Sequence, residues 1–197
     1  ETGEAGIGEI SEGGRNYVVT SFPLRNGSGE IAAFLHTVTE VHSDPPEELM
    51  ACDFFIRGLS QLKSKEGIYS FLLNFMNEVL DCAKLAVFLR AGNKLKCKMQ
   101  RGYRRPIKGE ELHLAGSGAR VESFKRNESL YLPKVKGKEN FIRYDPEVSC
   151  EFVAPIATSR DKLGVIDIRR YGPNSITPTE KNLIEVIASE VAKRVEK

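Results

Sequence analysis

The chain has 197 residues, of which 41% are hydrophobic and 28% are charged, as in an ordinary globular domain. No apolar run approaches the ~18 residues that a membrane-spanning helix needs, so we expect no membrane partner. The four cysteines are widely spaced and form no CxxC pair. This argues against a disulfide framework and a metal site, and favours reduced thiols in a cytoplasmic protein.

The net charge of +2 conceals a strong asymmetry along the chain. Residues 1–48 carry nine acidic and two basic side chains, a net charge of −7. Residues 84–138 carry fifteen basic and four acidic side chains, a net charge of +11. Such a contrast indicates two pieces of different origin, or an anion-facing surface on the second piece.

The first part of the chain has the pattern of a β-hairpin. Residues 1–14 are rich in Gly, Glu and Ser without periodicity, and we expect them to be a lead-in segment. Apolar residues in Arg15–Leu24 and Glu30–Glu40 flank the turn sequence Asn-Gly-Ser-Gly, which predicts two paired strands. A lone hairpin is marginally stable in water, so it must dock on something. The prolines within Ser43–Pro46 then favour a linker into a first helix.

Two helices and a second hairpin are expected next. Apolar spacing predicts helices over about Leu49–Leu62 and Ile68–Leu80. Lys84–Arg90 is almost wholly apolar, as a central strand would be. Lys94–Arg101 alternates between apolar and polar residues, which predicts a half-exposed strand with its apolar residues, up to Met99, on one face.

Residues 102–150 are less regular. Their pattern predicts short strands at Glu111–Leu114 and Leu130–Leu132 and a helix at about Ala119–Asn127. Two further strands are expected, at Glu151–Thr158 and Leu163–Arg170.

The start of the last helix has a clear capping signal. Thr177 is a natural N-cap, Pro178 suits the first turn, and Glu180 lies three residues after the cap. This spacing predicts a capping box and a helix that continues to the end of the sequence.

The most specific stretch is Cys150–Glu190, which contains CEFVAPIATSRDKLGVIDI and then ITPTEKNLIEVIASE. This stretch resembles the closing pattern of the GAF family. That pattern consists of a strand with apolar-x-Pro-apolar, a polar turn, Gly-Val-Ile-x-Ile and a final helix that begins with Thr. The resemblance implies an α+β fold with a central antiparallel sheet of about five or six strands. It also implies N- and C-terminal helices on one face of that sheet, and short helices and loops on the other.

A second resemblance concerns residues 14–42, which are similar to the end of a PAS domain. It rests on the segments Gly14–Tyr17, Ser21–Leu24, Gly29–Ile31 and Thr37–Glu40. The front strands and helices that build a PAS pocket have no counterpart here, so the resemblance gives no basis for a PAS ligand function. We expect residues 1–48 to form a lead-in, a PAS-like hairpin and a Pro linker, and residues 49–197 to form a GAF-like sensor domain.

The GAF resemblance implies a small-molecule pocket beneath residues 102–150, against the sheet. The candidate lining residues are Phe88, His113, Phe124, Tyr131, Phe141, Tyr144, Cys150 and Phe152. Ordinary core packing is the alternative for each of them. The ligand is unknown, and the sequence identifies no cofactor.

No catalytic constellation stands out, and we expect the chain not to be an enzyme. His113 with Cys150 is the one nucleophile pair worth keeping, since sequence does not show spatial neighbours. One alternative is a cysteine-dependent redox enzyme on a GAF fold. Another is a basic-surface nucleic-acid-binding module, which we do not favour because Tyr103 is the lone aromatic in the basic run.

The leading hypothesis is a regulatory sensing and dimerisation module of a signal-transduction protein, a histidine kinase or a transcription regulator. The apolar residues of the last helix approximate a heptad seam. They are Ile184, Ile187, Val191 and Val195. We therefore expect a homodimer through the terminal helices, with the hairpin packed either in cis or on the partner chain.

Overall fold

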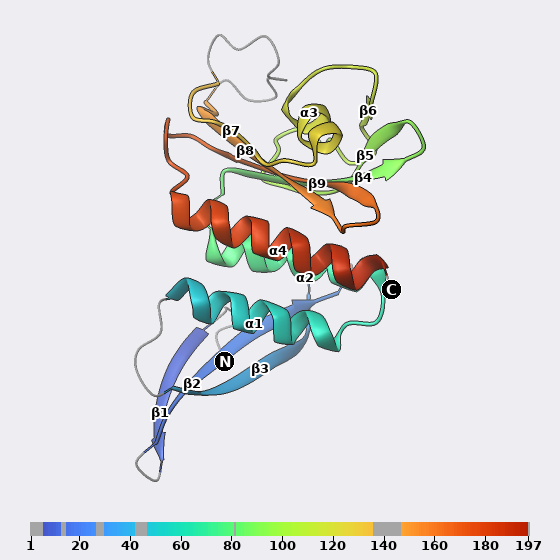
Figure 1. Ribbon diagram of the computed structural model, residues 1–197. Coiled ribbons are helices and arrows are strands. Elements are labelled where there is room, and N and C mark those ends of the chain that lie inside the picture. The colour runs from blue at the N-terminus through green and yellow to red at the C-terminus, as the bar shows by residue number, and fades with distance from the viewer. Residues whose placement is uncertain are drawn as a thin grey trace. The chain divides into compact units, whose positions relative to one another are not determined.

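A computed structural model describes residues 6–12, 15–26, 30–41, 47–80, 82–135 and 147–196. The chain divides into two compact units, Glu1–Leu62 and Lys63–Lys197 (Figure 1). The predicted helix at about 49–62 groups with the first unit in this division. The domain boundary expected at 48/49 stays a prediction.

The first unit contains a three-stranded antiparallel sheet in the order β1-β2-β3, followed by one helix. Its elements are β1 (Gly6–Glu12), β2 (Arg15–Arg25), β3 (Ile31–Val41) and α1 (Glu47–Gln61). The predicted hairpin corresponds to β2 and β3, but the expectation that residues 1–14 form only a lead-in is wrong for β1. Its glycines obscure any alternation, and pairing along β2 supplies the order that the local sequence does not signal.

α1 packs on one face of this small sheet. The Phe22 and Phe54 rings lie 5.6 Å apart, and Val18 on the same face is buried. The Thr39 hydroxyl donates a hydrogen bond to the Asp53 carboxylate of α1 over 3.3 Å. The helix thus supplies the docking surface that a bare hairpin would lack.

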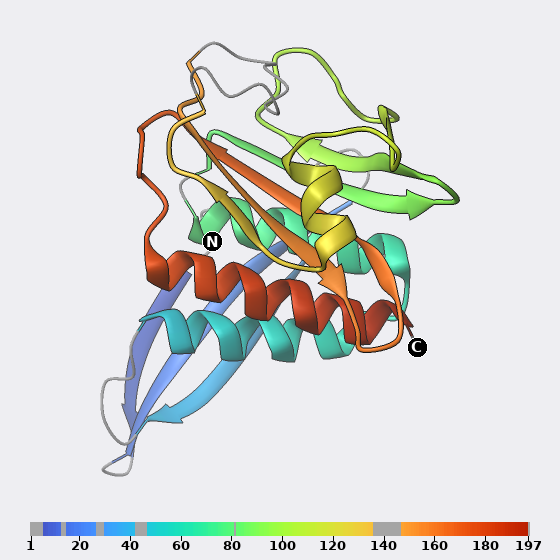
Figure 2. The same cartoon turned by 45° about the horizontal axis from the view of Figure 1, so that its top comes forward.

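The second unit is built on a six-stranded antiparallel sheet in the order β6-β5-β4-β9-β8-β7. Its strands are β4 (Lys84–Ala91), β5 (Lys94–Arg101), β6 (Glu111–His113), β7 (Leu130–Leu132), β8 (Cys150–Ala157) and β9 (Lys162–Arg170). Its helices are α2 (Lys65–Val79), α3 (Ala119–Arg126) and α4 (Pro178–Glu196). α2 and α4 cover one face of the sheet, and α3 lies across the other (Figures 1 and 2). The predicted α+β fold is confirmed.

A β-bulge breaks the predicted alternation in β5. Cys97 pairs with Phe88, but Met99 pairs with Val87, and Lys98 between them has no partner in the register. Directly paired residues share a face of a sheet. Met99 therefore lies on the opposite face from Cys97, and the expectation of one shared apolar face is wrong beyond the bulge.

Gly164 and Pro155, in the hairpin of β8 and β9, each occupy a position that suits the residue type. A Cβ atom added at Gly164 would lie 2.1 Å from the Phe88 carbonyl oxygen, so only glycine fits between β9 and β4. Pro155 lies in β8 beyond the segment Glu151–Val153 that pairs with β7. A proline is tolerated there because its missing N–H is not required by that neighbouring strand.

Candidate functional site

The sheet face that α3 covers, called here the α3-side face, is mostly apolar. Its core includes Phe88, Leu95 and Cys97 from the sheet and Phe124 from α3. This layer is the ordinary consequence of packing an amphipathic helix on a sheet.

Charged side chains interrupt that layer, and we call four of them, which form ion pairs with one another, the buried ionic cluster. The cluster consists of Arg120 on α3, Glu151 on β8, and Asp167 and Arg169 on β9. Each is at most 3% exposed. Burying ionised groups is costly unless they are paired and hydrogen-bonded, so their mutual geometry decides whether this face is stable.

Arg120 reaches from the first turn of α3 down to the sheet. Its Nε and Nη2 atoms donate to the Asp167 Oδ2 atom over 2.8 and 2.5 Å. Its guanidinium carbon lies 4.4 Å from the centre of the Phe88 ring, a cation–π contact. The Tyr103 hydroxyl donates to the same Asp167 oxygen over 3.4 Å.

Arg169 links the two carboxyl groups of the cluster. Its Nη2 atom donates to Glu151 Oε1 over 2.7 Å, and its Nε atom lies 3.2 Å from Asp167 Oδ2. Burial, followed by the charge of Asp167, raises the pKa of Glu151 to about 8. Burial also opposes ionisation of Asp167, but the charges of Arg120 and Arg169 outweigh it and lower the pKa of that carboxyl. The two carboxyls are therefore pushed to opposite protonation states at neutral pH.

The free space beside the cluster is small. A cavity of about 10 Å³ is lined by Leu112, Ser117, Gly118, Ala119, Arg120, Val121, Glu151 and Arg169. That volume holds about one water molecule. A larger ligand could enter the α3-side face only if these side chains moved.

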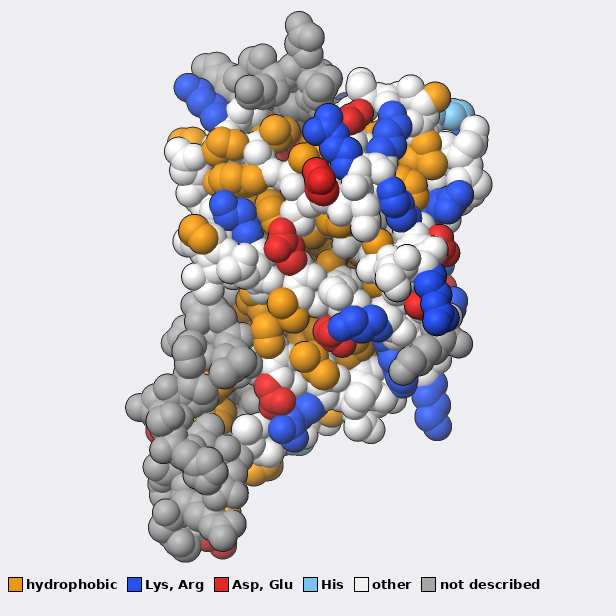
Figure 3. Space-filling model, in the orientation of Figure 1, with side chains coloured by type: hydrophobic (Ala, Val, Ile, Leu, Met, Phe, Trp, Pro, Cys, Tyr) orange, Lys and Arg blue, Asp and Glu red, His pale blue; other side chains and the backbone are white. Residues whose placement is uncertain are grey.

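A second hollow of 280 Å³ lies along β4 and β5, where basic side chains gather (Figure 3). It is lined by Leu89, Arg90, Ala91, Lys96, Cys97, Lys98, Lys108 and Gly109. Three of its cations approach carboxylates, with Lys98 2.7 Å from Glu66, Arg90 3.6 Å from Asp161 and Lys96 3.7 Å from Glu111. These pairs reduce its net charge, and nucleic-acid binding stays an untested alternative.

The predicted pocket residues divide between the two faces of the sheet. Phe88 and Phe124 belong to the core of the α3-side face, and His113 on β6 is exposed. The remaining described candidates, Tyr131, Cys150 and Phe152, lie on the face that α4 covers.

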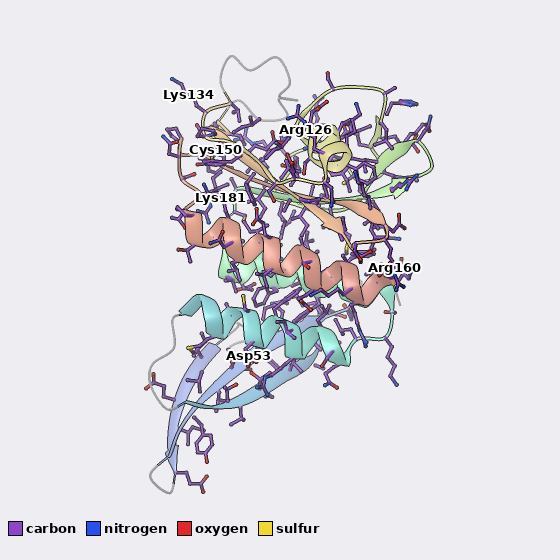
Figure 4. All side chains as sticks on the ribbon, viewed as in Figure 1. Asp53, Arg126, Lys134, Cys150, Arg160 and Lys181 are labelled. Atoms are coloured by element: carbon purple, nitrogen blue, oxygen red, sulfur yellow. The ribbon has the colours of Figure 1, made fainter. Side chains whose placement is uncertain are left out.

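Contacts with α4 and the loop before it place these three side chains. The Tyr131 ring lies 6.3 Å from Phe152 and 4.1 Å from the Lys181 ammonium of α4. Cys150 Sγ lies 3.1 Å from the Ser175 hydroxyl. In Figure 4, Arg126 on α3 and Lys181 on α4 lie on opposite sides of the sheet. His113 and Cys150, on well-separated strands, are not brought together as a nucleophile pair.

Phe141 and Tyr144 lie outside the described residues. That any of the eight candidates binds a ligand stays a prediction. The sequence reasoning missed the buried ionic cluster. A usable signal was present, because Asp167 and Arg169 interrupt the otherwise apolar run of β9.

The Cys, His, Asp and Glu side chains of the described residues do not gather into a metal site. Burial is the main cause that raises the pKa of Cys97 to about 12. Within the described ranges, no group of three or more His, Cys, Asp or Glu side chains could hold a metal ion. Among the helices of the described residues, none combines the length and apolar character needed to cross a membrane.

Comparisons with known proteins give matches to solved structures alone. No protein-family model matches the sequence, and no curated protein matches it. The GAF domain of the Acinetobacter phosphoenolpyruvate-protein phosphotransferase is 12% identical, with 77% of this chain and 94% of that chain covered and a TM-score of 0.68. The chain has the GAF fold. No finding bears on the PAS-like resemblance, which stays a prediction.

Enzymes also match this GAF-fold chain. Free methionine-R-sulfoxide reductase from Neisseria meningitidis, in complex with its substrate, is 13% identical. The match covers 78% of this chain and 93% of the reductase chain, with a TM-score of 0.66. The reductase from Staphylococcus aureus in its reduced form is 16% identical. The match covers 77% of this chain and 97% of the reductase chain, with a TM-score of 0.64. The expectation that the chain is not an enzyme is therefore corrected, because catalysts share its fold.

Proposed function

We propose that this chain is a sensory and regulatory segment of a signal-transduction protein, with the α3-side face as its small-molecule site. The observation that carries the proposal is a set of buried polar groups beneath a short helix. Small-molecule sites typically combine apolar walls with a few convergent polar groups, as Phe88, Asp167 and Arg169 do here. The similarity to the GAF domain of a phosphoenolpyruvate-protein phosphotransferase supports a regulatory role.

The proposal is tested by screening a panel of small metabolites for compounds that raise the melting temperature. A ligand of the α3-side face should stabilise the wild-type protein, and its effect should disappear in Asp167→Asn. The effect should persist in Arg126→Ala, since Arg126 is an exposed α3 residue that pairs with Glu122 over 3.4 Å. A panel without any stabilising compound, or a shift that is equal in all three proteins, would argue against this site.

A cysteine-dependent redox enzyme is the second candidate function. The reductase structures favour it, and Cys97 is a thiol on the α3-side face, where Phe88 is its cross-strand partner. Because the thiolate is the nucleophile and the pKa of Cys97 is raised to about 12, turnover should increase as the pH rises.

The assay for this second function is reduction of free methionine-R-sulfoxide with a dithiol reductant. Cys97→Ser should abolish turnover. Cys150→Ser, on the other face of the sheet, is the matched control and should retain it. Activity that survives Cys97→Ser would rule out this thiol as the nucleophile.

The remaining parts of the proposal concern assembly and context. The terminal helices would form a homodimer, and the chain would regulate a histidine kinase or a transcription regulator. The Glu1–Leu62 unit would supply the PAS-like strands, a suggestion that rests on sequence resemblance alone.

A further inference from the structure

The guanidinium group of Arg120 contacts three side chains from other segments of the chain. Asp167 comes from β9, Phe88 from β4, and Tyr103 from the segment that follows β5. Arg120 itself comes from α3. The receiving surface is therefore built by the sheet and the adjoining loop.

The receiving surface has the chemistry that recognises a planar cation. The Asp167 carboxylate accepts two N–H donors of the guanidinium, and the Phe88 ring lies against its flat face at 4.4 Å. The Tyr103 hydroxyl lies 3.5 Å from Arg120 Nη2. A carboxylate beside an aromatic face suits a guanidinium better than an ammonium ion, since the guanidinium is planar and more weakly hydrated.

We propose that Phe88, Tyr103 and Asp167 form a guanidinium-binding site that the chain fills with its own Arg120. Arg120 is then a tethered ligand that keeps free guanidinium or amidinium compounds out. This inference rests on the proposed function in its last step, because a ligand of the α3-side face must first displace Arg120. The 10 Å³ cavity beside Arg120 agrees with a site that is already full.

A simpler role for Arg120 would be to tie α3 to the sheet. Both roles predict that Arg120→Ala destabilises the protein, because it leaves the Asp167 carboxylate buried without this partner. A preformed guanidinium site predicts that the vacated space stays open and binds an added guanidinium ion more strongly than a neutral molecule of the same shape. If Arg120 only ties α3 to the sheet, the space is expected to close and to bind neither molecule.

The experiment compares wild type, Arg120→Ala and the control Arg126→Ala by thermal unfolding with methylguanidinium. Arg120→Ala should lower the melting temperature by about 10 °C relative to Arg126→Ala. About 10 mM methylguanidinium should raise the melting temperature of Arg120→Ala by a few degrees and leave the melting temperatures of the other two proteins unchanged. Urea at the same concentration, planar but uncharged, should recover nothing.

Two further measurements keep the proposal falsifiable. If Arg120→Ala does not fold alone, its refolding yield should depend on added methylguanidinium. In the double variant Arg120→Ala with Asp167→Asn, binding should weaken at least tenfold because the carboxylate acceptor is gone. Equal shifts in wild type and Arg120→Ala, no shift in Arg120→Ala, or recovery by urea would overturn the proposal.

Failure of this inference is distinguishable from failure of the proposed function. A metabolite without a guanidinium or amidinium group that stabilises the wild type through Asp167 would support sensing and overturn the guanidinium assignment. Methylguanidinium uptake by Arg120→Ala, with no metabolite that shifts the wild type, would support the assignment and not the sensing role.

Discussion

At the residue scale, Glu151 couples the stability of the GAF-like unit to pH. An unfolded glutamate has a pKa of about 4.3, whereas burial and the charge of Asp167 raise the pKa of Glu151 to about 8 in the folded protein. Between these values the folded state holds a proton that the unfolded state has lost. The stabilisation is therefore complete below the lower value and is lost as the pH rises through the upper one.

Glu151→Gln is expected to remove this pH dependence. The amide keeps the size of the side chain and carries no proton that titrates. Between pH 5 and pH 8, the free energy of unfolding of the variant should rise relative to wild type by about 1 kcal/mol per pH unit. Denaturant titrations at four pH values measure the difference, with the exposed Glu185→Gln as control. A difference in free energy of unfolding between Glu151→Gln and wild type that stays constant with pH would contradict the raised pKa of Glu151.

Gly164 is a second position where one residue decides the packing. Its added Cβ would meet the Phe88 carbonyl oxygen at 2.1 Å and the Leu89 Cα atom at 3.0 Å, and both are backbone atoms. Strands β9 and β4 would have to separate.

Gly164→Ala should therefore lower the free energy of unfolding by about 1–3 kcal/mol, as overpacked sites do. Gly8→Ala in β1 is the matched control, because an added Cβ there meets nothing within 4 Å. It should change the stability by less than about 1 kcal/mol. Equal effects of the two substitutions would contradict the close approach at Gly164.

At the scale of elements, α4 begins where the capping box predicts. The Glu180 N–H donates to the Thr177 hydroxyl over 3.2 Å, and the Thr177 N–H donates to Glu180 Oε2 over 2.7 Å. Glu180 also accepts from Arg170 of β9 over 2.6 Å. The same carboxylate thus caps the helix and joins it to the neighbouring strand.

This double role predicts an order of effects. Thr177→Ala should lower the free energy of unfolding by about 1 kcal/mol, the usual contribution of an N-cap. Glu180→Ala should cost more, about 2 kcal/mol, because it also removes the partly buried ion pair with Arg170. Chemical denaturation measures both, with Glu185→Ala in the same helix as the control. A larger loss for Thr177→Ala than for Glu180→Ala would show that Arg170 contributes little.

At the scale of the whole molecule, the proposed dimer needs apolar surface that the chain leaves uncovered. Ile184, Ile187 and Val191 of the predicted seam are buried, so they serve the chain's own core. Val186 on α4 remains 42% exposed.

If α4 forms the dimer, Val186→Glu should raise the dimer dissociation constant at least about tenfold, which corresponds to 1.4 kcal/mol. The melting temperature of the protomer should change little, because Val186 is partly exposed. Sedimentation over a range of concentrations measures the association, with Glu185→Gln as a control substitution at the neighbouring exposed position. A wild type that stays monomeric at high concentration would refute the dimer.

The sequence by itself determined the elements whose signals are local. The turn residues and alternation of the strands, and the Thr177–Glu180 spacing, act over a few residues and need no distant partner. The resemblance of the whole stretch Cys150–Glu190 to the closing pattern of the GAF family indicated the fold. β1 and the β5 bulge were missed because their conformations depend on a partner strand.

Only the tertiary structure decided the candidate site. Arg120 and Asp167 are 47 residues apart, and nothing near either residue in the chain signals the other. Asp167 and Arg169 lie in an otherwise apolar strand, and each requires a partner because a buried charge must be neutralised. Which side chain does so depends on how α3 crosses the sheet, and that crossing is set by the packing of the whole unit.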